Sequence, residues 1–145
     1  MIDELPEPTP DLDSQPFWDG LALGELRLQR CRACGALRWP ARAICNRCAS
    51  FDAEWVDCDG AGVVSSWIRT HQVFAPAYRD RVPYVVVRVE LVAQGDIRLI
   101  GGWHANRDPV VGESVAPRFV RRASGAFVLD WEPDLAPNTA RRLRS

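Results

Sequence analysis

The sequence contains no lysine, because all 18 of its basic residues are arginine. A chain without a lysine amine cannot form a Schiff base, whereas planar and permanently charged guanidinium groups suit phosphate or carboxylate. Only two histidines are present, His71 and His104, and neither belongs to a recognisable nucleophile motif. A glycine-rich phosphate loop and a Gly-x-Ser-x-Gly elbow are also missing. These absences argue against an independent enzyme, and we expect no catalytic residue in this chain.

No hydrophobic stretch approaches the length of a membrane span, so we expect no membrane association. The N-terminus lacks the positively charged, apolar-cored pattern of a signal peptide, which predicts a cytoplasmic protein with reduced thiols. The net charge of −1 conceals a segregation of charge along the chain. Residues 1–20 carry six acids and no base, while residues 21–50 carry six arginines and one acid.

Four of the five cysteines form two matched pairs, Cys31-x2-Cys34 and Cys45-x2-Cys48. A two-residue gap lets each pair curl into a knuckle whose sulfurs face one centre, as a tetrahedral zinc ion requires. Two disulfides or a redox-active pair would use the same residues, but a reducing compartment favours zinc. Four cysteine ligands close the coordination sphere, so we expect the zinc to serve folding rather than catalysis.

The first 30 residues change character at Ser14. Three prolines and five acids in residues 1–13 predict a disordered acidic tail. Ser14 can cap a short helix that ends before Gly24, and its apolar stripe packs either on its own domain or on another subunit. Leu26 and Leu28 alternate with polar residues, which predicts a strand leading into the zinc ribbon.

From residue 63 onward the sequence predicts β-strands, each bounded by glycine, proline or acidic turns. The expected strands are residues 63–73, 84–91, 97–103, 114–122 and 126–131. Five short strands in about 80 residues suit a small, partly open Greek-key barrel, most commonly an OB-fold, with an SH3-like barrel as the competitor. We therefore expect a mainly β protein with a short N-terminal helix, a zinc ribbon and a five-stranded OB-fold barrel.

The expected division of the chain has five parts. They are a disordered acidic tail (1–13), a helix with a lead-in strand (14–29), the zinc ribbon (30–50), the OB-fold (51–133) and a flexible C-terminal tail (134–145). The long loop at residues 72–83 carries aromatic and basic side chains, and in an OB barrel this loop lies at the binding face. A solvated connection is the alternative. The tight hairpins at 95–96 and 124–125 leave little room for function.

Several segments together resemble the DUF35 family over about residues 15–133. They are Phe17-Trp18-Asp19-Gly20, residues 24–31, the ribbon, Trp39-Pro40, Pro83-Tyr84-Val85-Val86 and residues 111–115. The resemblance implies an N-terminal helical segment, a rubredoxin-like zinc ribbon and an OB domain. It assigns the four paired cysteines to the metal and no residue to catalysis. Ala49 stands where the family usually has glycine, which puts only the shape of the second knuckle in question.

DUF35 members accompany thiolases, hydroxymethylglutaryl-CoA synthases, phloroglucinol-type acyltransferases and the aldolases that cleave steroid side chains. The resemblance therefore implies a non-catalytic subunit that binds and supports a thiolase-fold enzyme acting on acyl-CoA thioesters. We favour a retro-aldol lyase of steroid side-chain degradation, since an all-arginine composition suits an actinobacterial origin. A thiolase or an acyltransferase is the alternative partner. Two copies on a symmetric partner dimer would form a heterotetramer.

Two sets of residues are expected to make the contacts of this complex. The coenzyme A phosphates would meet guanidinium groups, namely Arg38, Arg42, Arg79 and Arg81. The partner enzyme would meet aromatic and aliphatic side chains, namely Phe17, Trp18, Leu21, Phe74 and Tyr78.

A single-stranded nucleic-acid-binding module is the alternative from a different class. Zinc ribbons and OB-folds often meet in such proteins, and aromatic residues could stack on bases, namely Trp67, Tyr84, Trp103 and Phe119. The pI of about 6.1 and the acidic tail weaken attraction to a polyanion, so nucleic acid is the less favoured partner.

Overall fold

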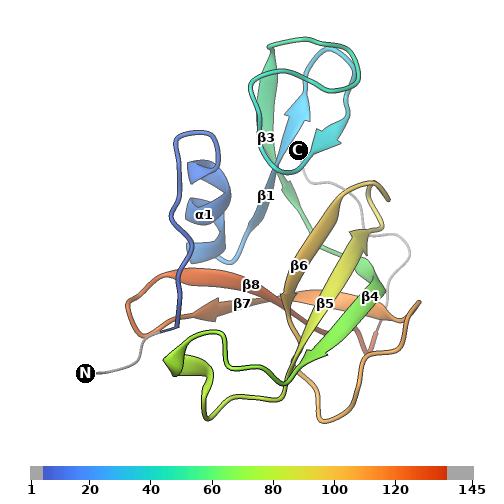
Figure 1. The fold of residues 1–145 in the computed structure, drawn as a ribbon. Helices are drawn as coiled ribbons and strands as arrows, with labels where there is room; N and C mark the ends of the chain where they lie inside the picture. The colour runs from blue at the N-terminus through green and yellow to red at the C-terminus, as the bar shows by residue number, and fades with distance from the viewer. Residues whose placement is uncertain (1–4, 137–145) are drawn as a thin grey trace.

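The computed structural model describes residues 5–136 and consists of two β-sheets with one short helix beside them (Figure 1). The helical elements are α1 (Gln15–Ala22) and the 3-10 turn η1 (Pro76–Tyr78). The strands are β1 (Leu26–Cys31), β2 (Leu37–Arg38), β3 (Ala53–Cys58), β4 (Gly62–Thr70), β5 (Tyr84–Leu91), β6 (Arg98–Gly102), β7 (Ser114–Arg121) and β8 (Phe127–Pro133).

The first sheet is antiparallel, in the order β2-β1-β3, and carries the cysteine knuckles at one end. Alternation along β1 places Leu26 and Leu28 inside, with Leu28 opposite Val56 of β3. This end of the molecule projects away from the second sheet in Figure 1. The ribbon expected from the paired cysteines is therefore present.

The second sheet has the order β6-β5-β4-β7-β8, with antiparallel pairing throughout. Its edge strands β6 and β8 are not joined by a ladder, but they approach where Trp103 bridges Trp131 and the His104 backbone N–H donates to the Trp131 carbonyl at 2.9 Å. A Cβ on Gly101 would lie only 2.3 Å from the carbonyl oxygen of Leu129, so only glycine fits at this crossing. The predicted mainly β fold with a five-stranded, partly open OB-like sheet is confirmed.

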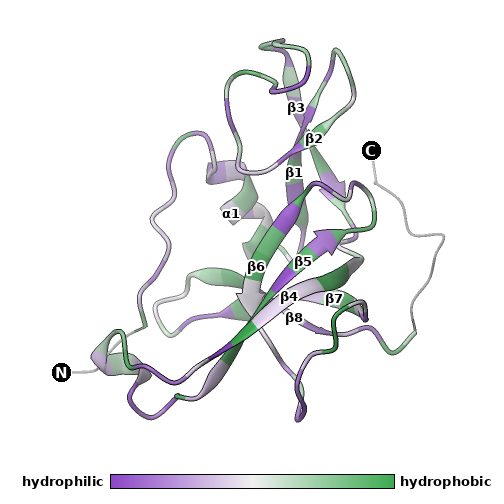
Figure 2. Ribbon diagram, turned by 45° about the vertical axis from the view of Figure 1, so that its right-hand side comes forward, coloured by the Kyte–Doolittle hydropathy of each residue, from purple (hydrophilic) through white to green (hydrophobic). Residues whose placement is uncertain are grey.

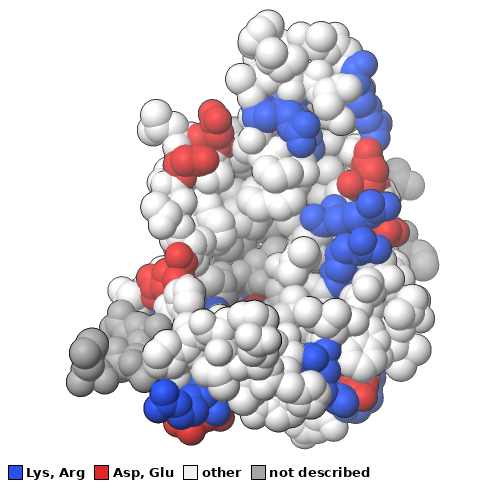
Figure 3. Space-filling model, in the orientation of Figure 1, with Lys and Arg blue, Asp and Glu red and all other residues white. Residues whose placement is uncertain are grey.

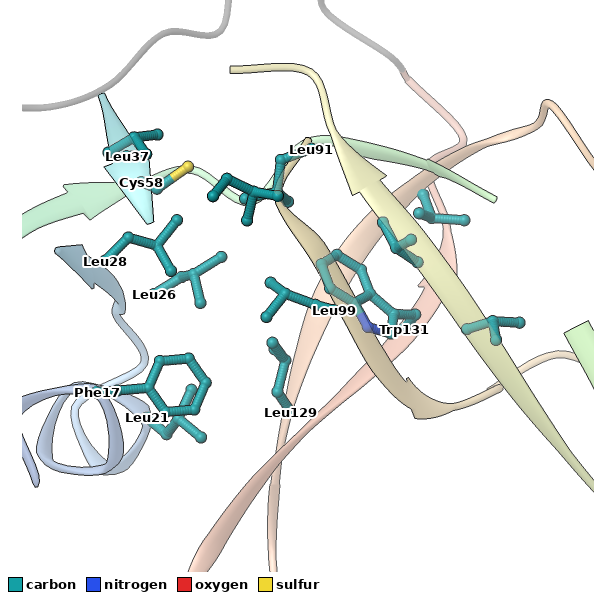
Figure 4. Close-up of a cluster of buried hydrophobic side chains, with 14 of the residues drawn as sticks. Phe17, Leu21, Leu26, Leu28, Leu37, Cys58, Leu91, Leu99, Leu129 and Trp131 are labelled. Atoms are coloured by element: carbon teal, nitrogen blue, oxygen red, sulfur yellow. The ribbon is translucent and has the colours of Figure 1, made fainter. Parts of the chain in front are cut away.

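One hydrophobic core joins α1, the base of the ribbon and the second sheet (Figure 4). Leu21 and Trp131 are fully buried, and the Phe17 ring lies 4.0 Å from that of Trp39, centroid to centroid. In the second half of β5, hydrophobic and hydrophilic positions alternate from Val87 to Glu90, as expected for a strand with one buried face (Figure 2). The helical stripe thus packs on its own chain.

The start of α1 differs in detail from the prediction. Ser14 occupies the N-cap position, but its side chain makes no capping hydrogen bond to the helix. Its hydroxyl instead donates to Asp11 Oδ1 at 2.7 Å and accepts from the indole Nε1 of Trp18 at 3.2 Å. The end of the helix agrees with the prediction, since Gly24 follows with φ +72°.

The two predicted tails fall partly outside the described residues, which exclude 1–4 and 137–145. Residues 5–13 lead into α1, and the Ser124 hydroxyl donates to a carboxylate oxygen of Glu7. No helix among the described residues is long and apolar enough to cross a bilayer.

Candidate metal centre and ligand pocket

The four paired cysteines meet at the tip of the ribbon. Their sulfurs all lie within 4.8 Å of one another. The Sγ atoms of Cys31 and Cys48 are 3.5 Å apart, and those of Cys34 and Cys45 are 3.7 Å apart. Tetrahedral zinc with Zn–S bonds of about 2.3 Å requires sulfur separations of about 3.8 Å. The four side chains therefore fit a zinc ion without rearrangement of the backbone.

Both knuckles have the same backbone shape. The N–H of Gly35 donates to the Cys31 carbonyl at 2.8 Å, and the N–H of Ala49 donates to the Cys45 carbonyl at 2.9 Å. Gly35 has φ +76° and Ala49 has φ +63°, so alanine adopts the left-handed conformation that glycine would adopt more easily. The second knuckle keeps its shape despite the alanine.

The electrostatics of the cluster favour thiolates that share a cation. Backbone N–H groups, first that of Arg47 and then that of Cys48, lower the pKa of the Cys45 thiol to about 6. At Cys48 the Ser50 N–H favours the thiolate, yet the neighbouring cysteines raise the pKa of this thiol to about 12. Four negative charges therefore cannot gather here without a positive ion, and zinc would supply that charge and cross-link the two knuckles.

A second feature is a pocket of about 690 Å³ at one end of the second sheet. Its walls come from the β4–β5 loop with η1, from the start of β5, from the segment after β6 and from the β7–β8 turn. The side chains used below are Arg69, Tyr78, Arg81, Tyr84, Trp103 and Arg122. In an OB-fold the middle strands and these two loops form the ligand-binding face.

A carboxylate–imidazole pair stands in the pocket wall. His104 Nε2 lies 2.6 Å from Asp130 Oδ2, and the Gly102 backbone N–H donates to Asp130 Oδ1 at 2.8 Å. Both oxygens of Asp130 are therefore engaged. His104 is half-buried and held by this contact, so its ring orientation is fixed.

A smaller hollow of about 440 Å³ adjoins this pocket. It lies between α1, Trp39 of the ribbon and β6, and Arg122 and Asp130 line both spaces. Figure 3 shows the molecule hollowed on this face, with charged atoms at the floor of the depression. The two spaces form one continuous depression, with an apolar part near Trp18 and Trp39 and a charged part near η1.

Both the ribbon and the second sheet match domains of one known family. Residues 18–54 match the family described as the ChsH2 rubredoxin-like zinc ribbon domain, and residues 55–120 match the ChsH2 C-terminal OB-fold domain. In structure the chain resembles the protein titled "Ltp2-ChsH2(DUF35) aldolase", with a TM-score of 0.77 and 29% identity over 88% of this chain and 98% of that one. The chain belongs to the DUF35 family.

Other DUF35-related proteins extend the comparison. A DUF35 protein of unknown function from Sulfolobus solfataricus shares the fold, with a TM-score of 0.59 and 19% identity over 85% of this chain and 86% of that one. A "probable enoyl-CoA hydratase alpha subunit" of Thermomonospora curvata is 38% identical over 86 residues, which are 59% of this chain and 26% of that protein. The "3-oxo-4,17-pregnadiene-20-carboxyl-CoA hydratase alpha subunit" of Mycobacterium tuberculosis is 32% identical over 136 residues, 91% of this chain.

This DUF35 chain spans only 26% and 41% of the length of those two curated relatives. Their names therefore describe proteins with a large additional part. In contrast, the chain covers nearly all of its structural neighbour in the aldolase.

The structure separates the four arginines that were predicted to meet coenzyme A. Arg38 is only 3% exposed, its Nε donates to Gln29 Oε1 at 2.6 Å, and its two terminal nitrogens are buried without a partner. Arg42 is exposed in the segment between β2 and β3 and does not line the pocket. Arg79 and Arg81 follow η1, and only Arg81 lines the pocket.

The predicted partner contacts are also divided. Phe17 and Leu21 are buried in the chain's own core, whereas Trp18 is half-buried. Phe74 is 70% exposed, and the Tyr78 ring stacks on Tyr84 with centroids 5.1 Å apart. The candidates for partner contact are therefore the half-buried Trp18 and the exposed Phe74 of the β4–β5 loop.

The pocket residues that sequence reasoning missed include Arg122 and Asp130. Arg122 flanks the 124–125 hairpin, which was expected to have little room for function, and Asp130 lies in the middle of a strand. The only available signal was the OB-fold itself, whose β-barrel order brings this hairpin beside the long loop.

Proposed function

We propose that this chain is a non-catalytic zinc-ribbon and OB-fold subunit that binds and supports a thiolase-fold enzyme acting on acyl-CoA thioesters. The proposed reaction of the partner is a retro-aldol cleavage in steroid side-chain degradation. The observation that carries this proposal is the likeness to the chain titled "Ltp2-ChsH2(DUF35) aldolase", which this chain covers over 98% of its length.

The names of the curated relatives support coenzyme A thioesters as the ligand class. Both relatives are named for an acyl-CoA substrate, and one substrate is the coenzyme A ester of a steroid acid. Because this chain matches a minor part of each, the hydratase activity in those names is not proposed for it. The shared part is proposed to serve assembly with a second enzyme.

The zinc site has a structural role in this proposal. The ion would be held by the four paired cysteines and would fix the ribbon as one rigid projection. The ribbon and α1 share one core with the second sheet, so fixing the ribbon also fixes the surface around Trp18 and Trp39. The proposed location is the cytoplasm, where these thiols stay reduced.

The partner would meet the half-buried Trp18 on this face and the exposed Phe74 of the β4–β5 loop. Tryptophan is enriched among the few central interface residues whose truncation weakens binding by about 2 kcal/mol or more. Two copies of the chain would bind a symmetric dimer of the enzyme and give a two-plus-two heterotetramer.

Co-purification tests the proposal. The tagged full chain is isolated from its native host, and the bound polypeptide is identified by mass spectrometry. We expect a thiolase-fold enzyme in a stoichiometric complex, and a partner of another fold, or none, would contradict the proposal.

A matched pair of variants tests the location of the interface. Phe74→Ser should weaken the complex, whereas Phe51→Ser, which alters a phenylalanine of similar exposure (73% against 70%) on the ribbon, should leave it intact. If both substitutions changed the stability of the complex equally, the β4–β5 loop would not be part of the interface.

A further inference from the structure

The pocket beside η1 has more positive charge than its own carboxylates can balance. Among its lining residues the acids are Asp108 and Asp130. Asp108 is ion-paired with Arg69, and Asp130 is engaged by His104 and the Gly102 N–H. Neither carboxylate is therefore left to neutralise a further cation.

Two arginines of the pocket make no ion pair with any described residue. Arg122 is half-buried, and its Nε is buried without a hydrogen-bond acceptor. Arg81 stands on the loop after η1, on another wall of the same space. Leaving a charged donor buried and unsatisfied is costly, whereas a phosphate oxygen would accept from it in a strong charge-assisted bond. These two guanidinium groups therefore favour an anion in the pocket.

The other walls are suited to a planar ring. Tyr78 and Tyr84 form a stacked pair with an interplanar angle of 27°, and the indole of Trp103 is fixed because its Nε1 donates to the Arg107 carbonyl at 2.7 Å. Aromatic side chains of this kind stack on nucleobases in OB-folds. A purely aliphatic ligand would leave Arg122 unsatisfied, and free phosphate would leave most of the space unused.

We propose that this pocket binds the adenosine 3′,5′-bisphosphate end of a coenzyme A thioester, with Arg81 and Arg122 contacting its phosphates. This inference rests on the proposed function and gives it a location on the chain. A pocket of about 690 Å³ falls within the range of about 300–1,000 Å³ that is usual for small-molecule sites. The ribbon arginines take no part, because the pocket lies at the opposite end of the second sheet.

Titration calorimetry of the full, zinc-loaded chain tests the site directly. The probes are adenosine 3′,5′-bisphosphate, adenosine, inorganic phosphate and a single-stranded oligonucleotide. We expect the bisphosphate to bind more tightly than adenosine or phosphate alone, because only it uses both the stacking face and the guanidinium groups.

Charge-removing variants identify the residues. Arg122→Gln and Arg81→Gln should each weaken binding of the bisphosphate about tenfold or more, which is the usual effect of losing one hydrogen bond to a charged group. Substitution of a nearby arginine outside the pocket removes the same charge and provides a matched control for each variant. Arg121→Gln and Arg79→Gln should change the affinity by less than about twofold, since exposed charges contribute little.

The remaining outcomes overturn the proposal. They are no binding of the bisphosphate by the wild-type chain, equal affinity for adenosine and the bisphosphate, equal losses in the control variants, or tighter binding of the oligonucleotide. Zinc content and thermal unfolding show whether Arg122→Gln still folds, and Arg81→Gln on the exposed loop gives an independent reading. Failure of this site would leave the proposed function standing wherever the thiolase-fold partner still co-purifies.

Discussion

Removing zinc from this protein should unfold the two cysteine knuckles and leave the second sheet intact. Chelation under reducing conditions is the perturbation, and Cys48→Ala is its genetic equivalent. In the knuckles, residues 31–35 and 45–49, the only buried side chains are those of Cys31 and Cys45. Without the metal, almost no buried apolar side chain stabilises the folded backbone of the knuckles.

The magnitudes favour local unfolding. Ordering ten residues costs about 10–20 kcal/mol in backbone entropy. A structural zinc ion contributes about 10–16 kcal/mol at neutral pH, which is close to the whole of that cost. Loss of the ion therefore makes the folded knuckles unfavourable. The second sheet keeps its own buried residues, such as Val87, Val89 and Trp131.

Amide hydrogen exchange measures this difference residue by residue. Five knuckle amides donate to backbone carbonyls, namely those of Cys31, Arg32, Gly35, Cys45 and Ala49. Their protection should vanish on chelation, while amides of the β4–β5 ladder remain protected. Cys58→Ala, at a buried cysteine outside the pairs, should retain both zinc and protection. Persistent protection of the five amides in zinc-free protein would refute the reasoning.

Three further predictions concern stability, each measured by chemical or thermal unfolding of the zinc-loaded chain. Ala49→Gly should stabilise by up to about 1 kcal/mol, because Ala49 has φ +63°. Gly101→Ala should destabilise by about 1–3 kcal/mol, since its Cβ would lie 2.3 Å from a β8 carbonyl, whereas Gly95→Ala meets no atom within 4 Å and should be harmless. Hydrogen bonding to Arg107 lowers the pKa of Glu113, so the charged carboxylate stabilises the folded protein above pH 4.5, and this stabilisation is lost as the pH falls further. In Glu113→Gln the free energy of unfolding should therefore fall less steeply below pH 4.5.

Each of these predictions has a clear contrary result. A neutral or destabilising Ala49→Gly would mean that the second knuckle is not strained. Equal stability of the two glycine variants would contradict the close crossing of β6 and β8. An unchanged acid profile in Glu113→Gln would show that this carboxyl is not held in its charged form by the fold.

The sequence predicted the zinc ribbon and the strands because both follow from local rules. The metal site was predicted from the two-residue spacing within each cysteine pair alone. The strand at 84–91 was predicted because Val87 and Val89 alternate with the polar residues that follow them. The helix was also predicted within one residue at each end, but not the use of the Ser14 hydroxyl. That hydroxyl is bound by Asp11 before the helix and by the indole of Trp18 within it, in place of the usual contact with a backbone N–H.

The pocket was only partly predictable, because it depends on contacts between distant segments. Tyr78 and Arg81 were found through the unusual length of their loop. Arg122 and Asp130 gave no local signal, and they reach the pocket only because β8 returns beside β6. The burial of Arg38 was equally hidden, since an arginine in a short strand is ordinarily exposed.

Reconstitution with the co-purified enzyme tests the central claim most directly. Cleavage of a steroid acyl-CoA thioester is measured for the enzyme alone, for this chain alone and for the two together. The account predicts activity in the mixture, none with this chain alone, and a complex in which each enzyme subunit carries one copy of the chain. Turnover by the isolated chain, or an enzyme that neither binds the chain nor gains activity from it, would contradict the account.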